Sequence, residues 1–266
     1  MSTTTDKSSF IDRLFQAGSH FGFKKSRRHP SVVPFVFTTK DGNDIFDLEK
    51  TTVLLESAKE VIKDAGLHGK TVLFVGTKDE ASVLVKAAAE KAESPYVSNR
   101  WIGGMLTNYS EIKKRINRLE VLTQERESGE LERKYKKKER VVLGREADKL
   151  SHNFFGISKM QKLPDLMVVV DPRHDSIAVA EAAERNIPVM AILSSDCDAS
   201  LVKHPVIAND SLQTSVKLLL TELVASYSDG KAAYVPKPVE ARPARPARTE
   251  RPARPARSSA PRRREG

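Results

Sequence analysis

Clustered cations are the residues of this sequence whose types and spacing best fit a binding function. Four of them lie within five positions of one another in the stretch 22–30, which also contains phenylalanine: Lys24, Lys25, Arg27 and Arg28. Cations at this density neutralise phosphates and release the counterions that surround a nucleic acid. We expect irregular backbone and phosphate contacts here, with a solvated surface loop as the alternative.

A second set of cations lies in the middle of the chain. Arg100 precedes Trp101, the only tryptophan, and the run 133–140 holds six cations and one acid. Both an ordinary charged helix surface and a contact with RNA or protein would explain this run. The candidate anion contacts of the region are Arg100, Lys113, Lys114, Lys136, Lys137 and Lys138.

Patterns for catalysis and nucleotide binding are weaker. Val75-Gly-Thr-Lys78 follows an apolar run, but the sequence has neither a complete phosphate-loop motif nor a Gly-x-Gly-x-x-Gly motif. Ligand sites of parallel α/β folds lie at the carboxyl ends of strands. Thr77, Lys78 and Asp171 are therefore the residues that an enzyme acting on a phosphorylated ligand would use. We expect no catalysis and keep this enzyme as the rival hypothesis.

Patterns for metal binding are also weak. Asp196 and Asp198 are as typical of turns as of metal sites. Cys197 is the only cysteine, which excludes an intramolecular disulfide and a cysteine-based zinc site. His20 and His29 do not have the spacing of a standard ligand pair. We expect Cys197 to be a small core residue, and its single thiol fits a reducing, cytoplasmic setting.

The net charge of +10 is unevenly distributed. From residue 237 onward one lysine and nine arginines stand against three glutamates, so the tail has a charge of +7 and the first 236 residues +3. Because the tail repeats Arg-Pro-Ala and has almost no apolar bulk, we expect residues 231–266 to be disordered. Arg242, Arg245 and Arg248 are expected to contact phosphates without sequence preference.

The elements that would position these residues follow from short apolar runs that alternate with helical patterns. Strands are expected at 71–75, 95–97, 166–170, 188–193 and 205–207. Helices are expected at 9–17 with Ser9 as cap, from Asp47 to 65, at 79–92, at 176–185, and from Asn209 or Asp210 to 227. This alternation predicts an α/β fold, a flavodoxin-like doubly wound parallel sheet covered on both faces. A small antiparallel pair is expected at 35–39 and 45–46.

The stretch between the two parts of this body has two thin apolar seams. Ile112 and Leu119 belong to one, Leu143 and Phe154 to the other, with spacings of four and three residues in alternation. This is the heptad pattern of an antiparallel coiled coil. We predict a body of residues 1–104 and 164–230, interrupted by a coiled-coil hairpin at 105–163 that turns at 128–130. No apolar run is long enough to span a membrane.

The segment 99–108 reads Asn-Arg-Trp-Ile-Gly-Gly-Met-Leu-Thr-Asn and joins the body to the hairpin. Trp101 is expected to anchor the base of the hairpin. Gly103 and Gly104 permit a tight bend of the backbone or the close approach of another chain. Asn108 is expected to form a capping box with Glu111, three residues further on.

Several segments, in order and in spacing, resemble the bacterial small-subunit ribosomal protein S-two family. The resemblance covers about residues 10–227, and its most specific part is the block Arg-Trp-Ile-Gly-Gly-Met-Leu-Thr-Asn. The matching segments are 17–22, 45–51, 73–78, 100–108, 164–166, 187–189 and 209–210.

The resemblance implies a structural, non-enzymatic role in the small ribosomal subunit. Proteins of this family bind 16S ribosomal RNA between the head and the body of the subunit and help to dock small-subunit protein one. The partners expected for this chain are thus 16S ribosomal RNA and neighbouring small-subunit proteins, including protein one. We expect no membrane partner and no isolated homo-oligomer.

Three positions depart from the family pattern. Phe23 stands where the family usually has a second histidine, and Ser194 and Ser211 stand where it usually has aspartate. Each change removes a potential metal ligand. We therefore expect no metal and no other cofactor in this protein.

Overall fold

The computed structural model describes residues 3–234, with side-chain surroundings from residue 10 onward. Most of the expected tail, with Arg242, Arg245 and Arg248, lies outside the described residues. Among the described helices, none combines the length and the apolar character that crossing a lipid bilayer requires.

A five-stranded parallel sheet lies at the centre of the described fold. Its strands are β4 (Val72–Val75), β5 (Tyr96–Val97), β6 (Leu166–Val170), β7 (Val189–Leu193) and β8 (His204–Ile207). They pair in the order β5-β4-β6-β7-β8, and each of these pairings is parallel. Numbered along the chain, this is the 2-1-3-4-5 order of flavodoxin-like folds. The predicted α/β class and parallel sheet are confirmed.

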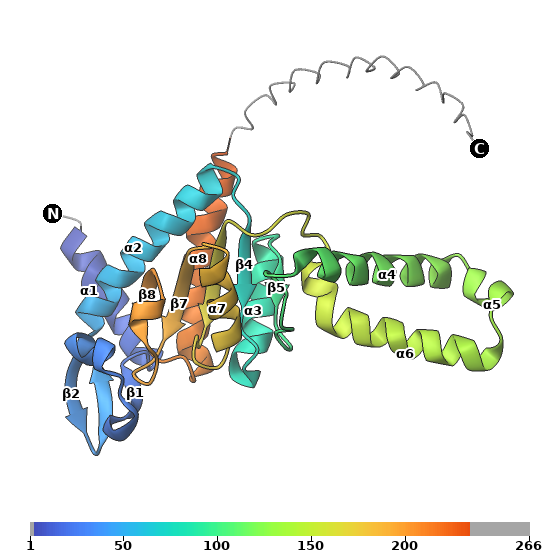
Figure 1. The fold of residues 1–266 in the computed structure, drawn as a ribbon. Coiled ribbons are helices and arrows are strands. Elements are labelled where there is room, and N and C mark those ends of the chain that lie inside the picture. Colours follow the sequence, from blue (N-terminus) through green and yellow to red (C-terminus); the bar gives the residue numbers. More distant parts are fainter. Residues whose placement is uncertain (1–2, 235–266) are drawn as a thin grey trace, which may run out of the picture. The chain divides into compact units, whose positions relative to one another are not determined.

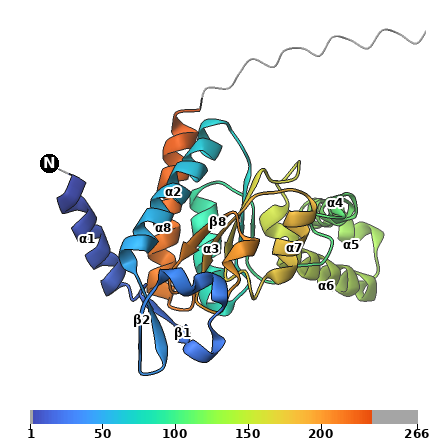
Figure 2. The same ribbon diagram turned by 60° about the vertical axis from the view of Figure 1, so that its left-hand side comes forward.

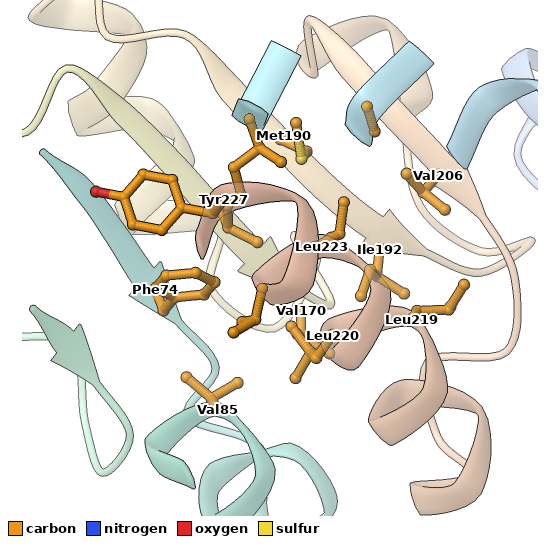
Figure 3. Close-up of a cluster of buried hydrophobic side chains, with 14 of the residues drawn as sticks. Phe74, Val85, Val170, Met190, Ile192, Val206, Leu219, Leu220, Leu223 and Tyr227 are labelled. Carbon is orange, nitrogen blue, oxygen red and sulfur yellow. The ribbon is translucent and has the colours of Figure 1, made fainter. Parts of the chain in front are cut away.

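Helices cover both faces of the sheet, because successive side chains of a strand point to opposite faces. One face packs against α2 (Leu48–Leu67), α3 (Asp79–Lys91) and α8 (Gln213–Ala232). Figure 3 shows Phe74 and Ile192 of the sheet and Leu220 of α8 within this buried cluster. The other face packs against α7 (Ser176–Glu184) and the segment 101–106.

The ends of several helices differ from the prediction. Asp47 caps α2 as expected, since its side chain accepts hydrogen bonds from the amides of Glu49 and Lys50. In contrast, α1 (Thr3–Gln16) begins before the predicted cap Ser9. Neither Asn209 nor Asp210 caps α8, because the Asn209 side chain closes a turn onto the amides of residues 211 and 212. The helix α8 then runs to residue 232, beyond the predicted body end at 230.

A three-stranded antiparallel sheet precedes α2. Its order is β1 (Phe21–Lys24), β3 (Asn43–Phe46), β2 (Val36–Lys40), which confirms the predicted pairing of β2 with β3. The expectation of irregular backbone at 22–30 was wrong. The chain there forms β1 and the 3-10 helices η1 (Lys25–Arg27) and η2 (Pro30–Phe35). The alternating Phe21 and Phe23 precede the cations and are typical of a strand, and β3 is the strand that pairs with it.

The connection between β5 and β6 contains α4 (Tyr109–Glu127), α5 (Glu130–Lys134) and α6 (Lys137–Phe154), which together we call the helical insertion, followed by the 3-10 helix η3 (Phe155–Ile157). The helices α4 and α6 run in opposite directions beside one another (Figures 1 and 2). The chain leaves α4 at Ser128, and Gly129 adopts the left-handed conformation with φ of 72°. The regular side-chain packing of a coiled coil stays a prediction.

The two seams of the helical insertion are buried to different degrees. On α4 the side chains of Ile112, Ile116 and Leu119 are buried, whereas on α6 Leu143 is only half-buried and Phe154 is buried. Residues at the base, including Ile112 and Phe154, share one apolar cluster with strands β4 and β6. The base of the insertion is therefore part of the core of the body, and its distal end is not.

Candidate nucleic-acid interface

The cations of the first basic cluster have different environments. Lys24, Lys25 and Arg27 are exposed and form no ion pair among the described residues. Arg28 is half-buried, and its Nε lies 3.2 Å from Oδ2 of Asp44, whose side chain is fully buried. A buried carboxylate needs such a partner, because desolvation destabilises an isolated charge. Arg28 thus has a structural ion pair, and an RNA contact for it stays a prediction.

The cations of the helical insertion lie on its surface. Lys113, Lys136, Lys137 and Lys138 are exposed and have no ion pair among the described residues. Lys114 is exposed too, but its Nζ lies 2.6 Å from Oε1 of Glu111 on the same helix. Exposed pairs of this kind are weak, so the ion pair does not prevent Lys114 from contacting a phosphate.

The base of the helical insertion is organised by Glu181 of α7, a buried carboxylate. Its Oε1 accepts hydrogen bonds from Trp101 Nε1 at 3.1 Å and from the amide of Gly104 at 2.8 Å. Its Oε2 accepts from the amides of Leu106 at 2.9 Å and Thr107 at 3.2 Å. One side chain of the body therefore binds four residues of the segment that joins the body to the helical insertion.

The ionisation of Glu181 follows from these contacts. Burial alone would raise the pKa of this carboxyl group, but the hydrogen bonds from Leu106, Trp101, Gly104 and Thr107 together lower its pKa below the ordinary value. Hydrogen bonds to the charged form favour it in this way. Glu181 is thus ionised at neutral pH. Arg185, which directly follows α7, donates a hydrogen bond to the carbonyl oxygen of Thr107.

The residues predicted to form the hairpin base lie together, with one correction. Trp101 is buried, and Gly104 adopts a φ of 87°, whereas Gly103 faces open space. Asn108 does precede the first residue of α4, but its side chain forms no capping hydrogen bond, so the expected capping box was wrong. The partner expected in that box, Glu111, instead pairs with Lys114. Arg100 is exposed and has no ion pair among the described residues.

The carboxyl ends of the parallel strands hold the residues of the rival enzyme hypothesis. Lys78 Nζ lies 3.1 Å from Asp171 Oδ2, 3.0 Å from Ser211 Oγ and 3.9 Å from Asp210 Oδ1. Thr77 donates from its amide and its hydroxyl to Asp175. The groups that would bind a phosphorylated ligand are thus engaged with carboxylates, which would repel a phosphate.

The same cluster contains the best arrangement of metal ligands among the described residues. Asp171, Cys197 and Asp210 place one ligand atom each within 4.8 Å of one another. Burial and the nearby Asp171 raise the pKa of Asp210 to about 7, against the opposing effect of Lys78. Burial, with the nearby carboxylates, also raises the pKa of the Cys197 thiol.

These residues do not fit a divalent metal well. The ammonium of Lys78 already supplies the positive charge of the cluster, and the ring of Phe23 lies 5.9 Å from its Nζ. The Cys197 thiol is buried, as predicted for a core residue, and its raised pKa keeps the proton that a metal ligand must lose. That the protein binds no metal stays a prediction.

Comparison with known proteins identifies the family. The model of the family described as ribosomal protein S2 matches residues 14–230. The chain belongs to this family. It is 39% identical over 224 residues to the small ribosomal subunit protein uS2c of Emiliania huxleyi, which covers 84% of this chain and 97% of that protein.

Bacterial relatives have similar identities. The chain is 40% identical over 222 residues to uS2 of Coprothermobacter proteolyticus, with 83% of this chain and 82% of the relative covered. It is 41% identical over 223 residues to uS2 of Nocardia farcinica, with 84% and 78% covered. As a member of a ribosomal protein family, the chain is a structural component and not an enzyme.

Two organising residues of this region were missed by sequence reasoning. Glu181 lies in the helical sequence Ala-Val-Ala-Glu-Ala-Ala, and a single acid among small apolar residues is a signal for a buried carboxylate. Asp44 is the second residue of β3, and no local pattern marks its pairing with Arg28.

Proposed function

We propose that this protein is a structural constituent of the small ribosomal subunit that binds 16S ribosomal RNA. The single observation that supports this most strongly is membership of the ribosomal protein S2 family over residues 14–230. Relatives named small ribosomal subunit protein uS2 or uS2c match more than four fifths of the chain. We infer that the site of action is the small subunit of the cytoplasmic ribosome, between its head and its body.

The proposed RNA contacts are cations that are exposed and unpaired. In the body these are Lys24, Lys25, Arg27 and Arg100, and in the helical insertion they are Lys113, Lys136, Lys137 and Lys138. Binding through such residues reads the phosphate backbone and the shape of the RNA more than its bases. The affinity should therefore fall steeply as the salt concentration rises.

Two finer parts of the proposal concern the helical insertion and the tail. We propose that residues 105–163 form an antiparallel coiled coil whose base is anchored through Trp101 and Glu181. We propose that the tail, with Arg242, Arg245 and Arg248, adds sequence-independent phosphate contacts. The chain would also help to dock small-subunit protein one, which the family resemblance implies.

Filter binding of the full chain to 16S ribosomal RNA at a series of salt concentrations tests the RNA contacts. We expect log affinity to fall linearly with log salt, and the slope to become shallower in variants that replace Lys24, Lys25 and Arg27 with glutamine. Glu184→Gln, an exposed change on α7, is a control that should leave the slope unchanged. An affinity that does not depend on salt would contradict the proposal.

A chain that ends at residue 234 separates the tail from the rest. We expect it to lose affinity for non-specific RNA while it still enters small subunits during reconstitution. If the shortened chain no longer enters subunits, the proposed division between body and tail is wrong. Subunits reconstituted with and without the full chain should differ in their capture of small-subunit protein one, and equal capture would exclude the docking role.

A further inference from the structure

The distal end of the helical insertion contains a groove that the phosphate contacts do not explain. It has a volume of about 440 Å³ and is lined by Tyr135, Lys138, Glu139, Val142 and Leu143. We call it the Tyr135 groove. Of these, Val142 and Leu143 lie three and four residues after Glu139 on α6, so the three share one side of that helix. Its wall is apolar and open, since the Val142 side chain is 58% exposed.

Free positive charge is concentrated beside this groove. Lys136, Lys137 and Lys138 are consecutive, exposed and without an ion pair among the described residues. Neighbouring cations are already paired: Lys134 Nζ lies 2.6 Å from Glu130, and Arg140 Nη1 lies 3.3 Å from Glu132. Lys138 lines the groove, and Lys136 and Lys137 precede it in the chain, so unpaired cations adjoin the groove. Arg133 is also exposed and has no ion pair among the described residues.

The acid in the groove does not cancel this charge. Glu139 Oε2 accepts a hydrogen bond of 2.9 Å from the amide of Lys136 at the start of α6. A carboxylate in the first turn is favoured there, because the free amides of a helix N-terminus carry partial positive charge. Glu139 thus has a local role that explains its presence.

The aromatic ring of the groove is isolated. Tyr135 is the only phenylalanine, tyrosine or tryptophan between residues 110 and 153. It lies in the extended connection between α5 and α6 and is half-buried, so part of its ring surface meets solvent. An aromatic ring beside unpaired cations combines the two features that bind single-stranded nucleic acid, which are stacking with a base and attraction of its phosphates.

We propose that the Tyr135 groove holds an unpaired base of RNA against the ring of Tyr135, with the adjoining phosphates at Lys136, Lys137 and Lys138. The inference rests on the proposed RNA-binding function and adds a specific contact to it. Bases of an RNA helix are already stacked, so the occupant is a base from a loop, bulge or end. An apolar peptide side chain would fill the groove but leave the three cations without counter-charge.

Binding of a short single-stranded RNA that contains one 2-aminopurine tests the proposal with the full chain. We expect Tyr135→Leu to weaken this binding about 5- to 150-fold, the loss of one base–aromatic stack. The salt dependence should not change, because the phosphate contacts stay. Tyr135→Phe keeps the ring and should bind like the original chain. Lys137→Gln is the converse change and should reduce the salt slope by about 0.7.

Fluorescence of the 2-aminopurine gives a second readout, since stacking on the tyrosine ring should quench it in the original chain and in Tyr135→Phe. The inference is overturned if the affinity of Tyr135→Leu for the single-stranded RNA is within twofold of that of the original chain. It is equally overturned if Tyr135→Leu weakens the binding of duplex RNA as much as the binding of single-stranded RNA. It is also overturned if Tyr135→Leu releases a subunit protein while RNA affinity stays the same, which would assign the groove to a protein.

The two proposals fail in different ways. If the original chain binds 16S ribosomal RNA with a steep salt dependence and Tyr135→Leu has no effect, only the inference about the groove is wrong. If the original chain binds no RNA at all, the proposed function itself is wrong. Thermal unfolding of each variant shows whether it is folded. If Tyr135→Leu is not folded, Tyr135→Phe keeps the test valid.

Discussion

Removal of the Glu181 side chain should detach the joining segment from the body. Glu181→Ala leaves five donors without their acceptor, since the Thr107 hydroxyl donates to Glu181 as well as the Thr107 amide. The hydrogen bonds from Trp101 Nε1 and from the Leu106 amide are buried. Each buried donor left unpaired costs about 1–3 kcal/mol. The two buried donors alone therefore predict a loss of about 2–6 kcal/mol in the free energy of unfolding. This is a large fraction of the stability of a domain.

Urea unfolding followed by tryptophan fluorescence measures this loss, and the only tryptophan is one of the donors. Glu184→Ala on the same helix is the matched control, because the Glu184 side chain is exposed and forms no hydrogen bond or ion pair with the described part of the chain. We expect the control to lie within about 0.5 kcal/mol of the original chain. If Glu181→Ala lies equally close, the joining segment is not held by this carboxylate.

The pH dependence gives an independent check. Because the hydrogen bonds lower the pKa of Glu181 in the fold below its ordinary value of 4.5, the folded state favours the charged form. The stability that it contributes is fully present above pH 4.5 and is lost as the pH falls through the folded pKa. The difference between the original chain and Glu181→Gln should therefore shrink below pH 4.5. A difference that does not change with pH would refute the assignment of an ionised Glu181.

Three further predictions concern the rest of the fold. The pKa of Asp210 in the folded state is raised to about 7, so the stability that this carboxyl group contributes is present at low pH and is lost as the pH rises to about 7. Urea unfolding at pH 5 and pH 8 should therefore show that Asp210→Asn gains stability relative to the original chain at the higher pH. A difference that is the same at both pH values would contradict this. Gly230→Ala should destabilise the contact of α8 with α2, because the added Cβ would lie 2.2 Å from the carbonyl oxygen of Lys63; an unchanged thermal midpoint would show that the helices can separate at little cost. Gly144→Ala meets no atom within 4 Å and should stabilise α6 by about 0.5–1 kcal/mol, which a lower midpoint would refute.

The parallel sheet was predictable because its signal is local. The run 166–170 is apolar at every position and appears as β6 with those bounds. The cap at Asp47 was predictable for the same reason, since its partners are the next amides along the chain. In contrast, Ser9 and Asn108 match capping patterns that the structure does not use. A local pattern permits a cap, but the contacts of the whole helix decide where the helix begins.

Contacts between distant residues were not predictable from one sequence. Glu181 binds residues that precede it by 74 to 80 positions, so no window along the chain contains both partners. The pairing of β1 with β3 was not predicted, because the cations at 24–28 indicated irregular backbone and outweighed the alternating phenylalanines. The positions of the cations were predictable, but which of them are free to contact a phosphate was not. Arg28 and Lys78 are paired with the carboxylates of Asp44 and Asp171, which lie elsewhere in the chain.

The most direct test of the central claim is sedimentation of the tagged full chain with ribosomal particles in a sucrose gradient. We predict that the chain migrates with the small subunit in near-equal amount. It should not migrate with the free large subunit, and it should leave the small subunit as the salt concentration rises. A chain that stays at the top of the gradient at low salt, while intact small subunits sediment below it, would contradict the account.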